Sequence, residues 1–256
     1  MKLDVFFTPA ELAGHTGAGR FVVADVIRAT SSMVAALHSG ARSVFPVASV
    51  DEAARLAQNL GRGEVLLCGE RRGLPIEGFD LGNSPGEFVA ERVAGKALVM
   101  TTTNGTQALL AVAELPSPKG GRGDGEGGSS MGRGVLIGSF LNLGAVAASL
   151  AAGGDPVSIV CAGRAGMFAL EDAVFAGALA NRLLELVDGG LERNDAAVAA
   201  MAMAKRFGRS LRPLLRRTAA GQAIIEIGLE DDLDFCADGD RFDIVPAFRD
   251  RKITLP

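Results

Sequence analysis

The sequence predicts a three-layer α/β/α fold with a largely parallel or mixed central sheet. Short apolar segments of strand composition alternate with segments whose apolar residues recur at helical spacing, which is the pattern of βαβ units. Four predicted strands end in polar turns, as in open α/β sheets that bind ligands at the carboxyl ends of their strands. With 256 residues, 48% of them hydrophobic, the chain is long enough to bury such a core.

Strands are expected where a short apolar run is bounded by turn residues. These runs span 2–7, 21–24, 43–47, 64–69, 96–100, 135–138 and 156–161, and a last strand is expected near Ile244. Helices are expected where apolar residues recur every three or four positions. These segments start at Met33 and then span 50–60, 87–91, 107–114, 143–152, 168–187, 195–207 and 210–219. The alternation favours parallel strands with helices on both faces of the sheet.

The segment 116–134 interrupts this alternation. It consists mainly of Gly, Pro, Ser and charged residues, which bury too little apolar surface to stay ordered. We therefore expect one domain over 1–256, with a flexible insertion that has no catalytic role. The alternative is a linker between two sub-domains, 1–115 and 135–256.

Composition excludes several classes of function. The net charge is −4, no basic block is present, and the chain has no Trp or Tyr to stack on bases, so a nucleic-acid surface is not expected. No apolar run reaches membrane-spanning length and the N-terminus lacks a secretory layout, so we expect a soluble, cytoplasmic protein, with homo-oligomerisation left open. The three cysteines are far apart and fit reduced thiols.

The four polar turns follow predicted strands and span 25–32, 70–84, 101–106 and 161–164. If the strands are parallel, all four turns open on one edge of the sheet and their side chains converge. Together they supply the acids Asp25, Glu70 and Asp80 and the arginines Arg28, Arg71, Arg72 and Arg164. Such a set suits a small, multiply anionic ligand bridged by Mg2+, and the alternative is a structural network of salt bridges.

The turn after the second predicted strand, 25–32, combines the residue types that bind an anion. The first amides of a helix lack internal partners, so the hydroxyl run from Thr30 through Ser31 to Ser32 either caps the helix or presents donors to an oxyanion. Arg28 adds a planar fork that fits phosphate, carboxylate or sulfonate. Asp25 would repel that anion unless a cation lay between them, which suggests a phosphate site with a divalent metal. The simpler interpretation is an N-cap with a surface ion pair.

Spacing rules out several other phosphate chemistries. The chain has no Gly-Lys-Ser/Thr phosphate loop, no Asp-x-Asp after a strand and no Arg-His-Gly. Arg164 lies three positions after Cys161, where a cysteine phosphatase needs six. Hydrolysis by metal-activated water remains. Glu171 and Asp172 then act as metal ligands, as a general base, or only as acids favoured at a helix N-terminus. The acidic segment 231–243 is predicted to be a solvated surface.

Several segments, in one order along nearly the whole chain, carry a resemblance to a known family. They are Asp25-Val-Ile-Arg-Ala-Thr-Ser-Ser32, Gly69-Glu-Arg-Arg72, Gly78-Phe-Asp-Leu-Gly-Asn-Ser-Pro85, Thr101-Thr-Thr-Asn-Gly-Thr106, Gly138-Ser-Phe-Leu-Asn142, Cys161-Ala-Gly-Arg164, Glu171-Asp172 and Asp243-Ile-Val-Pro246. With these segments the chain resembles the 2-phosphosulfolactate phosphatase family, the ComB-type enzymes of coenzyme M biosynthesis. The insertion at 116–134 is a departure from the family's pattern.

The resemblance implies Mg2+-dependent hydrolysis of (2R)-phospho-3-sulfolactate to (2R)-3-sulfolactate and phosphate. That substrate carries phosphate, carboxylate and sulfonate on three carbons, so it needs more than one arginine. Two alternatives remain, a phosphatase of another small phosphorylated hydroxy acid and a non-catalytic anion-binding module.

The expected site residues fall into three groups. The catalytic group comprises Asp25, Arg28, Arg164, Glu171 and Asp172. The substrate-binding group comprises Thr30, Ser31, Ser32, Arg71, Asn83, Ser84, Thr103, Asn104, Gly105, Thr106, Ser139 and Asn142. The expected Mg2+ ligands are Asp25, Glu70 and Asp80.

Overall fold

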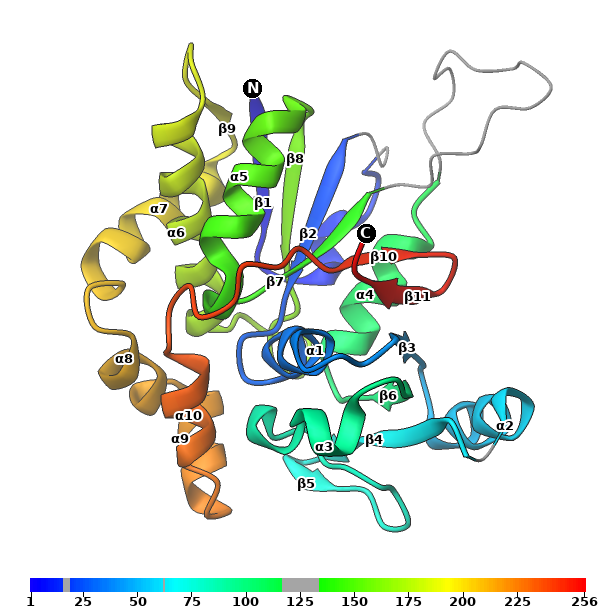
Figure 1. Cartoon of the computed structure of the whole chain (residues 1–256). Helices are drawn as coiled ribbons and strands as arrows, with labels where there is room; N and C mark the ends of the chain where they lie inside the picture. The colour runs from blue at the N-terminus through cyan, green and yellow to red at the C-terminus, as the bar shows by residue number, and fades with distance from the viewer. Residues whose placement is uncertain (16–18, 62, 117–133) are drawn as a thin grey trace, which may run out of the picture.

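The computed structural model describes residues 1–15, 19–61, 63–116 and 134–256, so the predicted insertion lies almost wholly outside the described residues (Figure 1). Within them, a single 11-stranded mixed sheet takes strands from both sides of that insertion. Across the sheet the strands are β5 (Leu74–Pro75), β4 (Val65–Arg71), β6 (Ala97–Thr101), β3 (Ser43–Pro46), β11 (Lys252–Thr254), β10 (Ala247–Arg249), β7 (Val135–Gly138), β2 (Arg20–Ala24), β8 (Val157–Cys161), β1 (Lys2–Phe6) and β9 (Glu192–Arg193). The predicted α/β class with a largely parallel, mixed sheet is confirmed.

The sheet consists of two parallel sets of strands joined by a hairpin, with the short strand β5 antiparallel to β4 at one edge. One set contains β4, β6 and β3, and the other contains β7, β2, β8, β1 and β9. The hairpin β10–β11 pairs antiparallel with β7 on one side and with β3 on the other. Because three consecutive pairings are antiparallel, the two sets run in opposite senses. The expectation that all the polar turns open on one edge of a parallel sheet is therefore wrong, although the turns still meet.

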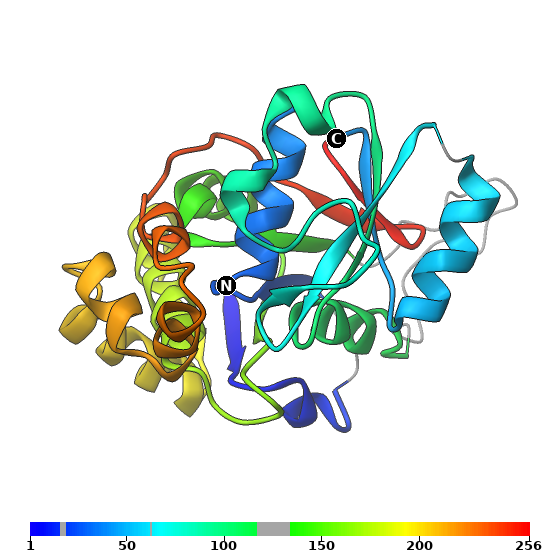
Figure 2. The same cartoon turned by 90° about the horizontal axis from the view of Figure 1, so that it is seen from below.

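Helices cover both faces of the sheet. They are α1 (Ala29–His38), α2 (Val50–Leu60), α3 (Ala90–Val93), α4 (Gly105–Ala113), α5 (Leu143–Gly153), α6 (Leu170–Leu186), α7 (Asp195–Phe207), α8 (Leu211–Arg217), α9 (Ala219–Glu226) and α10 (Asp231–Cys236), with 3-10 turns η1 (Pro9–Leu12), η2 (Pro85–Glu87) and η3 (Phe140–Asn142). Figures 1 and 2 both place α2 at one end of the molecule and α7 and α8 at the other.

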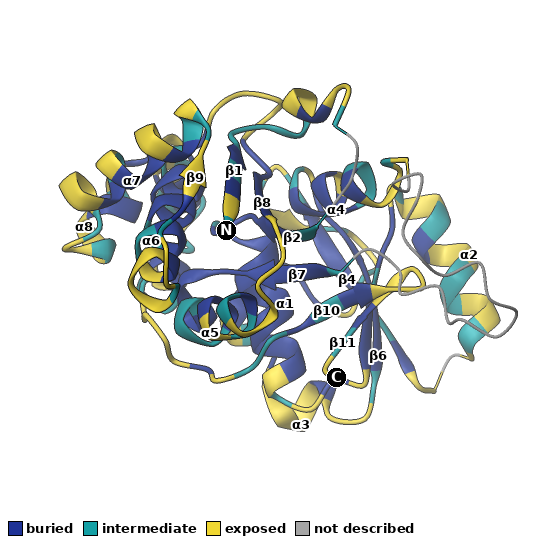
Figure 3. Cartoon of the chain, turned by 90° about the horizontal axis from the view of Figure 1, so that it is seen from above, coloured by how far each residue is buried: buried dark blue, intermediate teal, exposed yellow. Residues whose placement is uncertain are grey.

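The core follows the alternation of side chains along the strands. On β2, Phe21 and Val23 pack with α1 and α4, whereas Val22 and Ala24 pack with α5 and α6. A smaller cluster around Ala53 joins α2 to β4 and β6. Figure 3 shows the central strands buried and the outer faces of α2, α7 and α8 exposed. Among the described residues, no helix has both the length and the apolar character needed to cross a membrane.

Three predicted elements differ from the structure. The helix expected at 87–91 is divided into η2 and α3. The acidic segment expected to be solvated contains α10, whose Asp232 and Leu233 are buried. The last strand begins at Ala247 rather than near Ile244, and it continues into a hairpin. The C-terminal segment therefore adds both a helix to the protein's surface layer and two strands to its sheet.

Candidate active site

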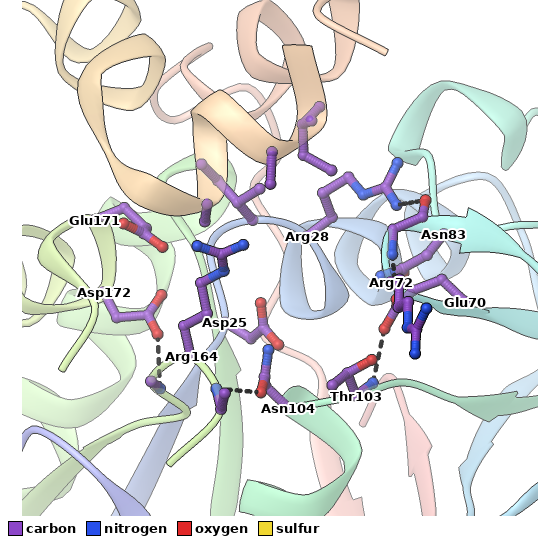
Figure 4. A pocket seen from close by; sticks show the side chains of 17 residues that line it. Asp25, Arg28, Glu70, Arg72, Asn83, Thr103, Asn104, Arg164, Glu171 and Asp172 are labelled. Carbon is purple, nitrogen blue, oxygen red and sulfur yellow. Dashed lines mark hydrogen bonds between the residues drawn. The ribbon is translucent and has the colours of Figure 1, made fainter. Parts of the chain in front are cut away.

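A cavity of about 280 Å³ lies between turns that follow strands of both parallel sets. The turns after β2, β4, β6 and β8, the start of α6 and one face of α9 all contribute to it (Figure 4). Its charged and polar lining consists of Asp25, Arg28, Glu70, Arg72, Asn83, Thr103, Asn104, Arg164, Glu171 and Asp172. All five predicted catalytic residues thus line one cavity, together with Glu70 and three of the predicted binding residues, Asn83, Thr103 and Asn104.

Asp25 lies at the centre of this cavity, directly after β2 (Figure 4). Burial, followed by the negative charges of Glu70 and Glu171, raises the pKa of Asp25 to about 7. Hydrogen bonds from the backbone amides of Ala29 and Gly105 oppose this shift without cancelling it. The carboxyl group is therefore poised to gain or lose a proton near neutral pH.

Gly105 allows α4 to start against Asp25. A Cβ atom at this position would lie 2.5 Å from the Cβ of Ala29 and 2.8 Å from Oδ2 of Asp25, closer than real side chains approach. Gly105 was predicted to bind substrate, but its amide binds Asp25 instead, and only a glycine lets that amide reach the carboxylate.

Glu70 ends β4 and joins two loops. Its Oε2 accepts a hydrogen bond from the backbone amide of Gly73 at 2.7 Å, and its Oε1 accepts one from the amide of Thr103 at 2.7 Å. The side chain is buried and lines the cavity. Glu70 therefore fixes the loop that carries Arg72 against the turn after β6.

Glu171 and Asp172 form the first turn of α6 on the opposite side of the cavity. Asp172 accepts hydrogen bonds from the amides of Val26 at 2.9 Å and Gly163 at 3.1 Å, so it joins the turns after β2 and β8. Burial raises the pKa of both carboxyl groups, and the positive charge of Arg164 partly opposes the shift at Glu171.

Arg164 and Arg72 are the exposed arginines of the cavity lining. The loop around Arg164 is held on both sides, because Gly163 donates to Asp172 and the amide of Ala165 donates to Oδ1 of Asn104 at 3.0 Å. This agrees with the prediction that Arg164 faces the site. The sequence predicts Arg72 among the convergent arginines but assigns substrate binding to Arg71, because sequence alone does not distinguish these neighbours; it is Arg72 that lines the cavity.

Arg28 differs from the prediction. It lines the cavity, but only 2% of its side chain is exposed, and its Nη1 lies 2.6 Å from Oδ2 of Asp232 in a buried ion pair. The same atom donates to Oγ of Ser84 at 3.1 Å, and Nη2 donates to the carbonyl of Gly73 at 2.5 Å. The guanidinium is thus engaged with the protein rather than open to an anion.

The predicted hydroxyl donors are also engaged internally. Thr30 bonds to the backbone of Asp25, Ser31 donates to the carbonyl of Val26, and Ser32 donates to that of Asn83. All three are fully buried and none lines the cavity. Buried hydroxyl groups need hydrogen-bond partners, and these three find them in backbone carbonyls of the protein. They therefore stabilise the turn rather than bind a ligand.

Of the other predicted binding residues, Ser84 and Gly105 lie outside the cavity lining, and four more do so because they are engaged with the protein. Thr106 closes the turn after β6 by bonding to Thr102. Ser139 and Asn142 form a capping box at η3, and Asn142 also donates to the carbonyls of Ile137 and Ile244. Arg71, the fourth, bonds to the carbonyl of Glu70 and to Thr101.

Asp80 is separated from the other expected metal ligands. It is exposed, lies outside the cavity, and its Oδ2 accepts a hydrogen bond from the amide of Leu67 at 2.8 Å. Asp80 therefore braces its own loop against β4. Of the three acids expected to bind Mg2+, the structure thus places Asp25 and Glu70 in the cavity and Asp80 outside it.

Asp232 and Asn83 complete the description of the site: the first was not predicted to take part in it, and the second was. Asp232 was assigned to a solvated segment, yet it pairs with Arg28, and no local pattern in the sequence marks that long-range contact. Asn83 was predicted to bind substrate; it lines the cavity, is buried, and its Oδ1 has no hydrogen-bond partner among the described residues. An unpartnered buried acceptor at a cavity wall is suited to a donor on a bound molecule.

Among the described residues, no three His, Cys, Asp or Glu side chains are grouped as a metal site. Mg2+ does not need such a group, because it binds through one or two carboxylates and completes its shell with water and phosphate oxygens. Asp25 and the neighbouring Glu70 and Glu171 repel one another in a buried setting, which a cation would relieve. The chemistry of these residues therefore fits a magnesium ion.

Carboxylates and arginines gathered at the ends of strands from both parallel sets define the class of protein: an α/β protein with a charged cavity of a size for a small molecule. The family model described as 2-phosphosulpholactate phosphatase matches residues 6–118 and 128–251. The chain belongs to the 2-phosphosulfolactate phosphatase family, whose members are phosphoric monoester hydrolases.

Curated relatives cover nearly the whole chain. A protein of Clostridium beijerinckii is 34% identical over 255 residues, covering 99% of both chains. One of Synechococcus is 38% identical over 250 residues, covering 96% of both, and one of Caldanaerobacter subterraneus is 38% identical over 228 residues, covering 89% of this chain and 87% of its own. Each carries the name probable 2-phosphosulfolactate phosphatase.

Proposed function

We propose that the protein is a Mg2+-dependent phosphatase that hydrolyses (2R)-phospho-3-sulfolactate to (2R)-3-sulfolactate and phosphate. Membership of the family supports this proposal. The observation that carries it is the cavity, in which the exposed Arg72 and Arg164 stand beside the buried acids Asp25, Glu70 and Glu171. In this proposal the enzyme works in the cytoplasm, in coenzyme M biosynthesis.

The charge of the cavity supports a cation as well as an anion. Its four lining acids face three arginines, and one of these, Arg28, is already paired with Asp232. A substrate with phosphate, carboxylate and sulfonate groups would be repelled by that balance if it bound alone. Mg2+ would supply charge for the phosphoryl oxygens and acidify a water molecule at the site. Asp25 and Glu70 are the residues that would hold it.

The remaining side chains would bind and orient. Arg164 and Arg72 would grip the anionic groups, because guanidinium forks match phosphate, carboxylate and sulfonate oxygens. In the hydrolysis a water oxygen attacks phosphorus, the bond from phosphorus to the ester oxygen breaks, and the released oxygen of sulfolactate takes up a proton. Glu171 lines the cavity and has a raised pKa, so it is suited to take the proton of the attacking water. Asp172 would position the turns on either side of it.

Phosphate release from a panel of phosphoesters tests this function. The full-length protein is incubated with phosphosulfolactate, phospholactate and 3-phosphoglycerate, each with Mg2+ and with a chelator. We expect the highest kcat/KM for phosphosulfolactate and loss of turnover with the chelator. Preference for another ester would assign the protein to a different phosphorylated hydroxy acid. Binding of inorganic phosphate without turnover of any ester would instead support a non-catalytic anion-binding module.

A further inference from the structure

One buried guanidinium joins four segments that are far apart in the chain. Arg28, the residue before α1, contacts Asp232 of α10, Ser84 before η2 and the carbonyl of Gly73 in the β4–β5 turn. Ser84 also donates to the same Oδ2 of Asp232 at 2.8 Å, so the three side chains form a closed group. Arg28, Ser84 and Asp232 are each more than nine-tenths buried. In this environment, removing one charge leaves the other uncompensated.

The turn that this group holds carries Arg72. The carbonyl of Gly73 accepts from Arg28, and the amide of Gly73 donates to Oε2 of Glu70 at 2.7 Å. Both polar backbone groups of Gly73 are therefore bound by charged side chains, one residue after the arginine that lines the cavity. With a φ of +84° at Gly73 and +55° at Arg72, the turn has a backbone conformation that needs such support.

The C-terminal helices pack on the outer side of the turn at Gly73. Ile224 and Ile227, in and directly after α9, approach the position where Gly73 would carry a Cβ, at 3.6 and 2.8 Å. Ala220, Ala223 and Ile224 of the same helix line the cavity. Figure 4 shows these helices lying over Arg28. Asp232 thus connects the helical cover of the cavity to the loop beneath it.

We propose that Asp232 is a positioning residue for substrate binding. It holds the guanidinium of Arg28, Arg28 holds the carbonyl of Gly73, and the fixed turn aims Arg72 into the cavity. This assignment rests on the proposed phosphatase function, because the anion that Arg72 would bind is the substrate. It also gives Arg28 an indirect role and leaves direct contact with the anion to Arg72 and Arg164.

A double-mutant cycle with Arg72 distinguishes positioning from a purely structural role. Asp232→Asn is expected to raise KM for phosphosulfolactate by about tenfold, with kcat changed much less, because the bound anion loses a well-placed arginine. In an Arg72→Ala background the same substitution should change KM by less than about twofold, since the residue through which it acts is already absent. If Asp232 had a purely structural role, Asp232→Asn would raise KM by the same factor in the wild-type and Arg72→Ala backgrounds.

Asp234→Asn is the matched control. Asp234 lies on the same helix, pairs with Arg212 and Arg216 on the surface, and its side chain is 41% exposed. This variant should keep the KM and kcat of the wild type. If Asp232→Asn fails to fold, Ser84→Ala removes one bond from each of the two charged partners and should raise KM in the same direction by a smaller factor.

Hydrogen exchange gives a readout that does not depend on turnover. Asp232→Asn should speed exchange in 70–75 relative to β8, because the Gly73 carbonyl loses its fixed partner. Wild-type protein that turns over no phosphoester would refute the proposed function, while this exchange result would still test the position of the turn. Active wild-type enzyme with an unchanged KM in Asp232→Asn, or an equal effect in both Arg72 backgrounds, would overturn the inference.

Discussion

Oε1 of Glu70 accepts a hydrogen bond from the backbone amide of Thr103 at 2.7 Å, which connects the end of β4 to the turn after β6. The same carboxylate binds the amide of Gly73. Parallel strands β4 and β6 already pair through their backbones, so the side chain adds a second connection beyond the point where the ladder ends. That connection holds two parts of the cavity lining, Arg72 and Thr103, in a fixed relation.

Glu70→Gln should therefore reduce both stability and activity. One of the two backbone donors would face the amide NH2 of the new side chain, and a buried donor without an acceptor costs about 1–3 kcal/mol. We expect a lower midpoint of urea unfolding and at least a tenfold loss of kcat/KM. Glu87→Gln is the control, because Glu87 accepts a bond from the amide of Gly82 at 2.9 Å but lies outside the cavity. A control variant with the same loss of activity would refute the interpretation.

Arg164→Ala should impair catalysis without affecting stability. The side chain is exposed at the cavity, so its removal should change the free energy of unfolding by less than about 0.5 kcal/mol. Loss of a charge-assisted contact to the substrate should lower kcat/KM by about 100-fold. Arg164→Lys should keep only part of the wild-type kcat/KM, since an ammonium group lacks the planar fork of a guanidinium. Arg182→Ala, at an exposed ion pair on α6, should behave as wild type.

The fold and the position of the cavity could be predicted from the sequence, because both follow from local patterns of strands, helices and turns. Alternating strands and helices predicted the fold, and the polar turns at strand ends predicted the cavity around Asp25 and Arg164. Strand composition does not encode direction, so the opposite senses of the two parallel sets were not foreseen. The hairpin β10–β11, which reverses the direction, comes from the last residues of the chain.

Individual side-chain roles were predicted less well than their location. Whether a hydroxyl such as Ser32 binds a ligand or a carbonyl depends on which backbone group lies within 3 Å, and Ser32 binds the carbonyl of Asn83 at 2.7 Å. Likewise, Arg28 has the chemistry of an anion ligand, but Asp232, 204 residues away, is its partner. These contacts exist only after tertiary packing and leave no local signature.

Gly105→Ala should test the contact between α4 and Asp25. The added methyl group would collide with the Cβ of Ala29 and with Oδ2 of Asp25, both of which are buried. Relief requires moving α4 away, which removes the amide from the carboxylate and costs about 1–3 kcal/mol as for other overpacked sites. Calorimetry should show a lower Tm, and activity should fall with it.

Gly86→Ala is the matched control for that substitution. A Cβ at Gly86 meets no atom within 4 Å, and its φ is not in the left-handed region. The alanine should therefore be neutral or slightly stabilising, because it restricts the unfolded chain. Equal destabilisation by both substitutions would show that the space around Asp25 is not what makes Gly105 necessary.

Asp25→Asn should remove activity and weaken the decline in stability that the metal-free wild type shows as pH rises. The pKa of Asp25 is about 7 in the folded protein against 3.8 for the free side chain. Below pH 3.8 both states hold the proton and the group has no effect on stability. Between 3.8 and 7 the unfolded chain has lost its proton while the folded protein keeps it, so stability falls as pH rises, and above pH 7 the loss is complete.

Asparagine cannot ionise, so the stability of the variant does not fall as pH rises from 3.8 to 7. Urea unfolding in the presence of a chelator should show that the stability of Asp25→Asn relative to wild type rises by roughly 1–4 kcal/mol between pH 5 and pH 8. Adding Mg2+ should stabilise the wild type and not the variant, because a cation that binds only the folded protein shifts the equilibrium toward it. A difference that does not change with pH would show that the ionised form of Asp25 is not under strain in the folded protein.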